Sequence, residues 1–346
     1  MNTKELESAL LALPYPGLSR TMGELKLISE VKVKNNHATI ELLTVSDDSY
    51  LTVKNAIESA FSSLFDTLEV TKKATPKKDM NYGNSAAPNN RAPYAKNVIA
   101  VTSGKGGVGK STVCVNLAIA LAQKGYRVGL LDADVYGPNV PRLTNTDLER
   151  IKWNDDNKIV PSENYGLKIM SVALTTPTSD TPLVWRSSVA VSALIQFLED
   201  VAWGELDFLV IDMPPGTGDI QLTMAQELPI TAGVIVTTPQ LVASDDVSRA
   251  IRMFQDIHVH IGGLVENMSY FIAPDTGARY DIFGTGGGER LSQRYNVPLL
   301  GQIPLNMAIR EGSDNGEPPV ALGDESLKNY YREVVEKLLE TTKFRV

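Results

Sequence analysis

Residues 104–111 read Gly104-Lys105-Gly106-Gly107-Val108-Gly109-Lys110-Ser111. The stretch matches the pattern G-x-x-x-x-G-K-S/T at every constrained position, and Thr112 follows it. It comes after an apolar segment, 97–102, that is typical of a buried strand, and it leads into a segment, 110–123, with helical character. The glycines of such a loop let backbone N–H groups point at phosphate oxygens, and the helix N-terminus adds positive potential. The sequence therefore predicts a loop, residues 104–112, that binds the phosphates of ATP.

Three side chains of this loop have predicted roles in phosphate chemistry. We expect Lys110 to reach the β- and γ-phosphates of ATP and the hydroxyl of Ser111 to bind Mg²⁺. Lys105 lies inside the loop. Its spacing alone is as compatible with a solvated surface charge as with a cation that stabilises negative charge during phosphoryl transfer. The predicted activity is an ATPase with Mg²⁺ as cofactor.

Carboxylates follow two of the apolar segments. Asp132 and Asp134 come after the segment 127–131, and Asp212 comes after 206–211. In open α/β sheets the carboxyl ends of the strands face the ligand-binding crevice. Asp212 is predicted to hold Mg²⁺ through water, and Asp134 to position the water that attacks the γ-phosphate. A single Asp after a strand is more often a helix cap or turn residue, but two beside a phosphate loop favour the catalytic interpretation.

The chain beyond residue 96 alternates between strand-like and helix-like segments. The predicted strands are 97–102, 127–131, 167–173, 206–211, 232–237, 259–265 and 299–303. The predicted helices are 110–123, 187–200, 219–228, 244–256, 285–295 and 324–341. Near-continuous apolar strands between helices are typical of a parallel sheet that is covered on both faces. The predicted fold class is α/β, a doubly wound and mostly parallel sheet of the P-loop NTPase type.

A smaller unit is predicted before this fold. Residues 1–71 have the pattern of a small α+β domain, with two strands joined by a turn at Lys34-Asn35-Asn36. Residues 72–95 are rich in Lys, Pro, Asn, Ser and Ala, which predicts a flexible linker. Residues 96–346 form the predicted ATPase domain.

Composition limits the environments and partners that we expect. The formal net charge is −8, and an acidic surface repels phosphate backbones, so nucleic acid is not an expected partner. No apolar run approaches the ~20 residues that span a bilayer, and residues 1–13 lack the pattern of a secretory signal. Cys114 is the only cysteine, which fits a reducing compartment. We therefore expect a cytoplasmic protein with no membrane partner.

Residues 105–112, Lys-Gly-Gly-Val-Gly-Lys-Ser-Thr, resemble the deviant Walker A motif of the MinD/ParA/nitrogenase iron protein class. The resemblance implies that Lys105 reaches across a homodimer to the phosphates of the partner subunit. It also implies that Asp134 and Asp212 match the switch I and switch II aspartates of the class. Asn267 matches an asparagine that contacts the adenine ring in related ATPases.

Longer stretches resemble the Mrp/ApbC branch of this class. They are residues 132–141, 212–219, 266–269 and 283–288. This resemblance implies an ATP-dependent carrier that binds iron–sulfur clusters and passes them to apoproteins, with apoprotein clients or iron–sulfur assembly proteins as partners. The small N-terminal domain and the linker match the usual arrangement of the branch.

The sequence departs from that branch where cluster ligands are expected. Many members carry Cys-x-x-Cys shortly after the Asn-Met-Ser segment, and one pair from each subunit would hold a 4Fe–4S cluster. Here residues 270–277 read Tyr-Phe-Ile-Ala-Pro-Asp-Thr-Gly. Cys114 is expected in the core, and His258 and His260, on one face of a predicted strand, lack a third ligand. The sequence leaves open whether a cluster binds and through which ligands.

Two other functions stay open at this point. One is a MinD/ParA-like positioning switch without cluster handling, which would act by reversible assembly on membrane or DNA. The segment 324–346 has the helical spacing of a membrane-binding helix, but its balanced charge favours packing onto the domain. The other is a nucleotide-gated scaffold with negligible turnover.

Overall fold

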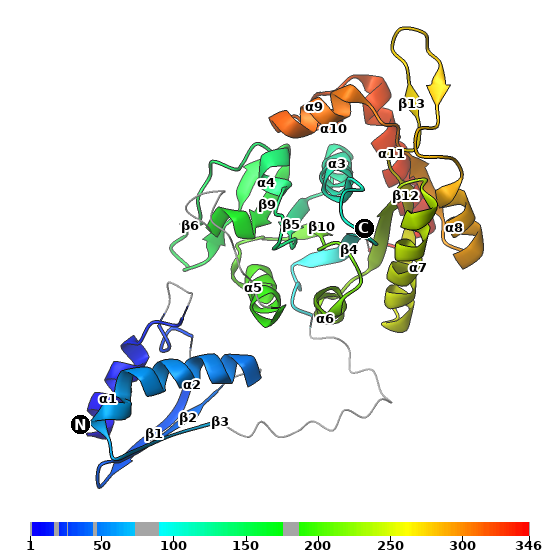
Figure 1. Cartoon of the computed structure of the whole chain (residues 1–346). Coiled ribbons are helices and arrows are strands. Elements are labelled where there is room, and N and C mark those ends of the chain that lie inside the picture. Colours follow the sequence, from blue (N-terminus) through cyan, green and yellow to red (C-terminus); the bar gives the residue numbers. More distant parts are fainter. Residues whose placement is uncertain are drawn as a thin grey trace. The chain divides into compact units, whose positions relative to one another are not determined.

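The structure is a computed structural model that describes residues 2–16, 21–25, 27–43, 47–72, 90–175 and 187–345. The chain divides into two compact units, Met1–Ser85 and Ala86–Val346 (Figure 1). Most of the predicted linker, 72–95, lies outside the described residues. Its last part belongs to the second unit, because Ala92 is buried and a strand begins at Ala95.

The first unit is a small sheet with two helices. Its elements are α1 (Thr3–Ala12), β1 (Ile28–Lys34), β2 (His37–Leu42), α2 (Asp47–Phe61), the short 3₁₀ helix η1 (Ser62–Leu64) and β3 (Thr67–Lys72). β2 pairs antiparallel with β1 and parallel with β3. Asn35 and Asn36 join β1 to β2 with φ values of 50° and 63°, a conformation that asparagine tolerates in tight hairpin turns. Leu6 of α1 and Ile57 of α2 are buried with Ile40 of β2 in its core.

The second unit is built on an eight-stranded sheet in the described part of the chain, with the order β15-β12-β11-β4-β10-β5-β9-β8. The strands are β4 (Ala95–Ser103), β5 (Val128–Asp132), β8 (Ser162–Asn164), β9 (Leu167–Ser171), β10 (Leu206–Asp212), β11 (Ala232–Thr237), β12 (Ile261–Glu266) and β15 (Leu299–Gln302). All neighbours pair in parallel except β8, which is antiparallel to β9. The predicted fold class is confirmed.

Helices cover both faces of this sheet (Figure 1). They are α3 (Lys110–Gln123), α4 (Val140–Leu143), η2 (Val172–Thr175), α5 (Ser187–Asp200), α6 (Asp219–Glu227), α7 (Leu241–Asp256), α8 (Gly287–Tyr295), α9 (Met307–Asn315), α10 (Pro319–Leu322) and α11 (Glu325–Thr341). One apolar core contains Leu194 of α5, Met224 of α6 and Ile251 of α7. A separate core contains Leu117 of α3 and Tyr331 of α11. Two cores, one for each set of helices, explain why the central strands are apolar on both faces.

Several short elements were not predicted. They include the helices α4, α9 and α10 and the strands β6 (Lys152–Trp153), β7 (Ile159–Val160), β8, β13 (Phe271–Ile272) and β14 (Arg279–Tyr280). The interpretation of His258 and His260 as a pair on one strand face is wrong. β12 begins only at Ile261, and His258 has a φ of 59° in the preceding turn.

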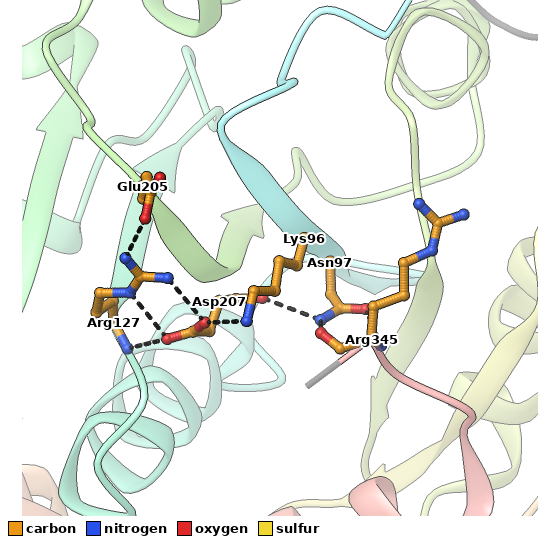
Figure 2. A network of polar contacts seen from close by, with 6 residues as sticks. All are labelled: Lys96, Asn97, Arg127, Glu205, Asp207 and Arg345. Carbon is orange, nitrogen blue, oxygen red and sulfur yellow. Dashed lines mark hydrogen bonds and ion pairs between the residues drawn. The ribbon is translucent and has the colours of Figure 1, made fainter.

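A polar network ties together the N-terminal ends of three central strands (Figure 2). The Asp207 carboxylate of β10 accepts hydrogen bonds from the backbone N–H of Arg127 at 3.0 Å and from its side-chain Nε at 3.1 Å. Lys96 Nζ of β4 lies 2.9 Å from the same carboxylate. Asn97 Nδ2 donates to the carbonyl oxygen of Arg345 at 2.9 Å, which joins the C-terminal segment to β4. These bonds hold the strands in register at the end of the sheet opposite the predicted phosphate loop.

Candidate nucleotide-binding site

The phosphate loop connects β4 to α3, as predicted. Gly107 and Gly109 both have φ values of +80°, a left-handed conformation that other residues adopt only with strain. Gly104 permits a close approach of α7, since a Cβ there would lie 2.3 Å from the carbonyl carbon of Asp246. The loop glycines therefore serve two needs, the curvature of the loop and its packing against α7.

A pocket of about 350 Å³ opens above this loop. Six of its lining residues belong to the predicted loop: Gly106, Gly107, Gly109, Lys110, Ser111 and Thr112. Asp134 and Pro215, which follow β5 and β10, line it as well. The pocket thus lies at the carboxyl ends of the parallel strands, where ligands bind in open α/β sheets.

Lys110 lies between the two predicted catalytic carboxylates. Its Nζ is 2.6 Å from Asp212 Oδ1 and 3.4 Å from Asp134 Oδ2, and its side chain is 6% exposed. Burial lowers the pKa of Lys110, but the negative charges of Asp212 and Asp134 outweigh this effect and raise it above the ordinary lysine value. Lys110 is therefore a buried ammonium ion, held by the carboxylates that would share a nucleotide site with it.

Asp132 has a structural role that sequence reasoning did not assign. Its Oδ1 accepts the N–H of Asp134 at 3.1 Å, and its Oδ2 accepts the N–H of Val140 at 3.2 Å and the hydroxyl of Ser171 at 3.0 Å. Burial, together with the charge of Asp212, raises the pKa of Asp132 to about 8. The side chain holds the segment that carries Asp134 and leads to α4. The Asp-x-Asp spacing was the only sequence signal for this role.

The buried oxygens of the site fit a magnesium ion. Within the described residues, Asp134 Oδ1 and Asp212 Oδ2 are buried without a hydrogen-bond partner. Burial raises the pKa of Asp212. Hydrogen bonds from Lys110 and Ser111 act in the opposite direction but do not cancel this effect. Because Mg²⁺ prefers carboxylate, hydroxyl and water oxygens, Ser111 and Asp212 are suitable to hold it.

Asn267 and Lys105 have hydrogen-bond partners other than Lys110, Asp212 or Asp134. Asn267 follows β12, and its Nδ2 donates to the carbonyl oxygen of Val108 at 2.9 Å, so it contacts the phosphate loop directly. Its predicted contact with adenine stays a prediction. Lys105 Nζ donates to Gln240 Oε1 at 3.2 Å, at the start of α7, and its role across a dimer also stays a prediction.

Comparison with known proteins identifies the family. A model of the ParA family, described as the NUBPL iron-transfer P-loop NTPase, matches residues 94–339. The chain belongs to this family. The match confirms the resemblance drawn from the sequence, and it makes the chain a P-loop NTPase of the iron-transfer type.

Relatives of this P-loop NTPase bear one recurring name. The chain is 41% identical to the iron–sulfur cluster carrier protein of Synechocystis over 332 residues, 94% of this chain and 93% of the relative. It is 52% identical to the protein of that name from Deinococcus radiodurans over 70% of this chain and 68% of the relative. With the Aquifex aeolicus protein of that name it is 50% identical over 66% of this chain, but the match spans only 63% of the relative.

Solved structures resemble the NTPase unit. A nucleotide-binding protein of Archaeoglobus fulgidus, solved with ADP, has a TM-score of 0.59 and 38% identity, covering 66% of this chain and 89% of that one. The cell division ATPase MinD of Pyrococcus furiosus has a TM-score of 0.55 at 21% identity, covering 71% and 99%. The second likeness concerns the fold alone.

In this P-loop NTPase the segment where the Mrp/ApbC branch often carries cysteines is a hairpin, β13–β14. Arg279 of β14 lies over the ring of Tyr270, with its Cζ 4.2 Å from the ring centroid.

Cys114 is fully buried in α3, and burial raises the pKa of its thiol. In the described ranges, no three His, Cys, Asp or Glu side chains are grouped to hold a metal ion. Nor does any helix in those ranges have the length and apolar character to cross a membrane.

Proposed function

We propose that this chain is an Mg²⁺-dependent ATPase that carries iron–sulfur clusters, or assists their transfer, to apoproteins. The contact of Lys110 with Asp212 and Asp134 beneath a glycine-rich phosphate loop supports the ATPase activity. The relatives named iron–sulfur cluster carrier protein, at 41–52% identity, support the cluster-related task. Nucleotide binding is supported by the Archaeoglobus fulgidus protein, which was solved with ADP.

The residues of the site suggest how hydrolysis proceeds. Backbone N–H groups of the loop bind the phosphates, and Lys110 exchanges its contact with Asp212 for the β- and γ-phosphates. Asp134 Oδ1, which has no hydrogen-bond partner in the described chain, accepts a hydrogen bond from the attacking water and orients it. The water oxygen attacks the γ-phosphorus, the bond to the β–γ bridging oxygen breaks, ADP leaves with that electron pair, and the two protons of the water stay on the inorganic phosphate that forms. Ser111, and Asp212 through water, would hold Mg²⁺, which would supply positive charge next to the phosphates.

The nucleotide state would be transmitted by the segments that follow β5 and β10. Asp134 and Pro215, one from each segment, line the pocket. Asp132 connects the first of these segments to α4 through the N–H of Val140. A contact with the γ-phosphate would order both segments, and hydrolysis would release them.

The proposal includes a homodimer. Lys105 lies in the loop but contacts Gln240 rather than the group around Lys110. A lysine in this position is available to a nucleotide bound by a second subunit. We therefore assign to Lys105 the stabilisation of phosphate charge across the dimer.

A positioning switch on membranes has weaker support. The likeness to MinD concerns the fold, whereas the carrier proteins share about twice its sequence identity. The C-terminal helix α11 buries Tyr331, Val334 and Leu338 against the domain. Its apolar face is therefore occupied and does not resemble a free membrane-binding face.

A cluster-transfer assay tests the proposal. The chain is incubated anaerobically with iron and sulfide, then mixed with an apo-ferredoxin, and holo-ferredoxin is followed by absorption with and without MgATP. We expect faster transfer with MgATP for the wild type and no such acceleration for Lys110→Ala. Equal transfer with and without the wild-type chain would contradict the carrier function, while phosphate release measured in parallel tests the ATPase separately.

A further inference from the structure

One wall of the phosphate pocket comes from two helices that the sequence analysis did not predict. Arg142 of α4 and Ser313 and Asp314 of α9 line the pocket together with the loop. The helices pack closely, because a Cβ on Gly316, just after α9, would lie 2.8 Å from the carbonyl oxygen of Arg142. Residues distant in sequence from the phosphate loop therefore complete its pocket.

Arg142 brings a cationic side chain to this wall. The residue is exposed, and no hydrogen bond or ion pair involves its guanidinium within the part of the chain that the structure describes. By contrast, Arg310 of α9 donates to Asp314 Oδ2 at 3.0 Å and to Glu311 Oε1 at 2.8 Å. A guanidinium has five N–H donors in a planar arrangement that suits phosphate oxygens. Arg142 is thus a donor at the pocket without an acceptor among the described residues.

The wall adjoins the part of the pocket formed by the first turn of α3. Asn116 of α3 donates from Nδ2 to the carbonyl oxygen of Thr112 at 2.8 Å, and its Oδ1 accepts the N–H of Val320 at 3.0 Å. Val320 belongs to α10, which follows α9, so these bonds fix the α9–α10 region beside Thr112. Backbone N–H groups of a phosphate loop of this kind cradle the α- and β-phosphates, the two that lie nearer the ribose. ADP and ATP have these phosphates in common.

We propose that Arg142 is a nucleotide-binding residue whose guanidinium donates to the phosphates that ADP and ATP share. The proposal rests on the proposed function of the chain as a nucleotide-binding ATPase. It has a mechanical consequence, because α4 is joined to Asp132 through the N–H of Val140. A nucleotide held by Arg142 also holds the segment that carries Asp134.

The test measures the affinity of the full-length chain for MgADP and for MgATP by titration calorimetry, at low temperature to suppress turnover. We expect Arg142→Ala to raise Kd about tenfold for both nucleotides, the effect of roughly one charge-assisted contact. Arg142→Lys keeps the charge but loses the planar donor arrangement, so its Kd for each nucleotide should lie between those of the wild type and Arg142→Ala. Arg150→Ala is the matched control: this arginine follows α4, donates to the backbone carbonyls of Asp147 and Glu149, and does not line the pocket.

Each outcome bears on the proposal. Wild-type affinity for both nucleotides in Arg142→Ala would overturn it, and so would a loss confined to ATP, which would place the side chain at the γ-phosphate. An equal loss of nucleotide affinity in Arg150→Ala would also overturn it, because the loss would then follow from the net charge of the chain and not from a contact of Arg142. A wild-type chain that binds neither nucleotide would refute the proposed function itself, a result distinct from a failure of Arg142 alone. Thermal unfolding of nucleotide-free variants confirms that each one folds.

Discussion

Lys110 Nζ of the phosphate loop lies 2.6 Å from Asp212 Oδ1 at the end of β10. The contact joins two motifs that are 102 residues apart in the sequence. Both side chains are buried, and the raised pKa of Lys110 keeps its positive charge in place. A nucleotide phosphate would therefore replace one anionic partner of Lys110 by another, and the released Asp212 would be available to Mg²⁺.

Lys110→Ala should abolish most ATP hydrolysis. The variant loses the cation that stabilises charge on the transferred phosphoryl group, so we expect kcat to fall by roughly 10²-fold or more. The measurement is phosphate release at saturating MgATP. Lys124→Ala serves as control, because Lys124 pairs with Glu336 on the surface. This variant should hydrolyse ATP at the wild-type rate. A Lys110→Ala enzyme with an active wild-type kcat would contradict the mechanism, and equal, background-level phosphate release from both proteins would favour a nucleotide-gated scaffold.

Asp134→Asn should separate binding from catalysis. The amide keeps the size of the side chain but orients the attacking water poorly, so kcat should fall by about 10²–10⁴-fold, as is typical for removal of such a group. The Kd for MgADP should stay within a few-fold of the wild type. The control is Asp147→Asn, at an exposed position outside the pocket. Equal kcat values in wild type and Asp134→Asn would exclude this role.

Lys105 can be tested by complementation between subunits. Lys105→Ala and Lys110→Ala should each be nearly inactive alone. In an equimolar mixture, half the dimers are mixed and each has one complete site, so activity should return to about a quarter of the wild-type value. A mixture no more active than its components would show that Lys105 does not act across the dimer. Gln240→Ala should leave this complementation intact, because it removes only the present partner of Lys105.

Asp207→Asn should lower stability in a pH-dependent manner. Hydrogen bonds from the Arg127 side chain and backbone hold the pKa of Asp207 well below its usual range. Its stabilisation is therefore complete above the unfolded pKa of ~4 and is lost as the pH falls toward the folded value. Its cationic partners, Arg127 and Lys96, are about half exposed, so solvent screening limits the loss at pH 7 to about 1 kcal/mol of unfolding free energy.

Urea unfolding at pH 7 and at progressively lower pH measures this effect. The difference between wild type and Asp207→Asn should shrink as the pH falls below ~4, because the unfolded wild-type chain then binds a proton at Asp207 that the folded chain does not. Asp281→Asn is the control, because its pair with Arg279 is on an exposed hairpin and should contribute little. A difference that is constant with pH would mean that Asp207 acts through packing and not through its charge.

Long elements of the large unit were predictable because their signals are local. The buried strand β10 and the helix α3 have apolar patterns that extend over several residues, so their predicted and observed bounds differ little. The helix α4 has four residues and β13 has two, too few to show any periodicity. His258 and His260 are predicted to share one face of a strand, but β12 begins only at Ile261 and the chain turns at His258.

The sequence by itself determined the phosphate loop, the class of the sheet and the presence of carboxylates at two strand ends. These features depend on residue types at fixed local spacing, which backbone geometry translates directly into structure. Only the tertiary structure decided that Lys110 contacts Asp212, that Asp132 serves as an anchor, and that Arg142 of α4 reaches the phosphate pocket. Such contacts arise from the order of strands in the sheet and from helix packing across it, and local spacing carries no information about either.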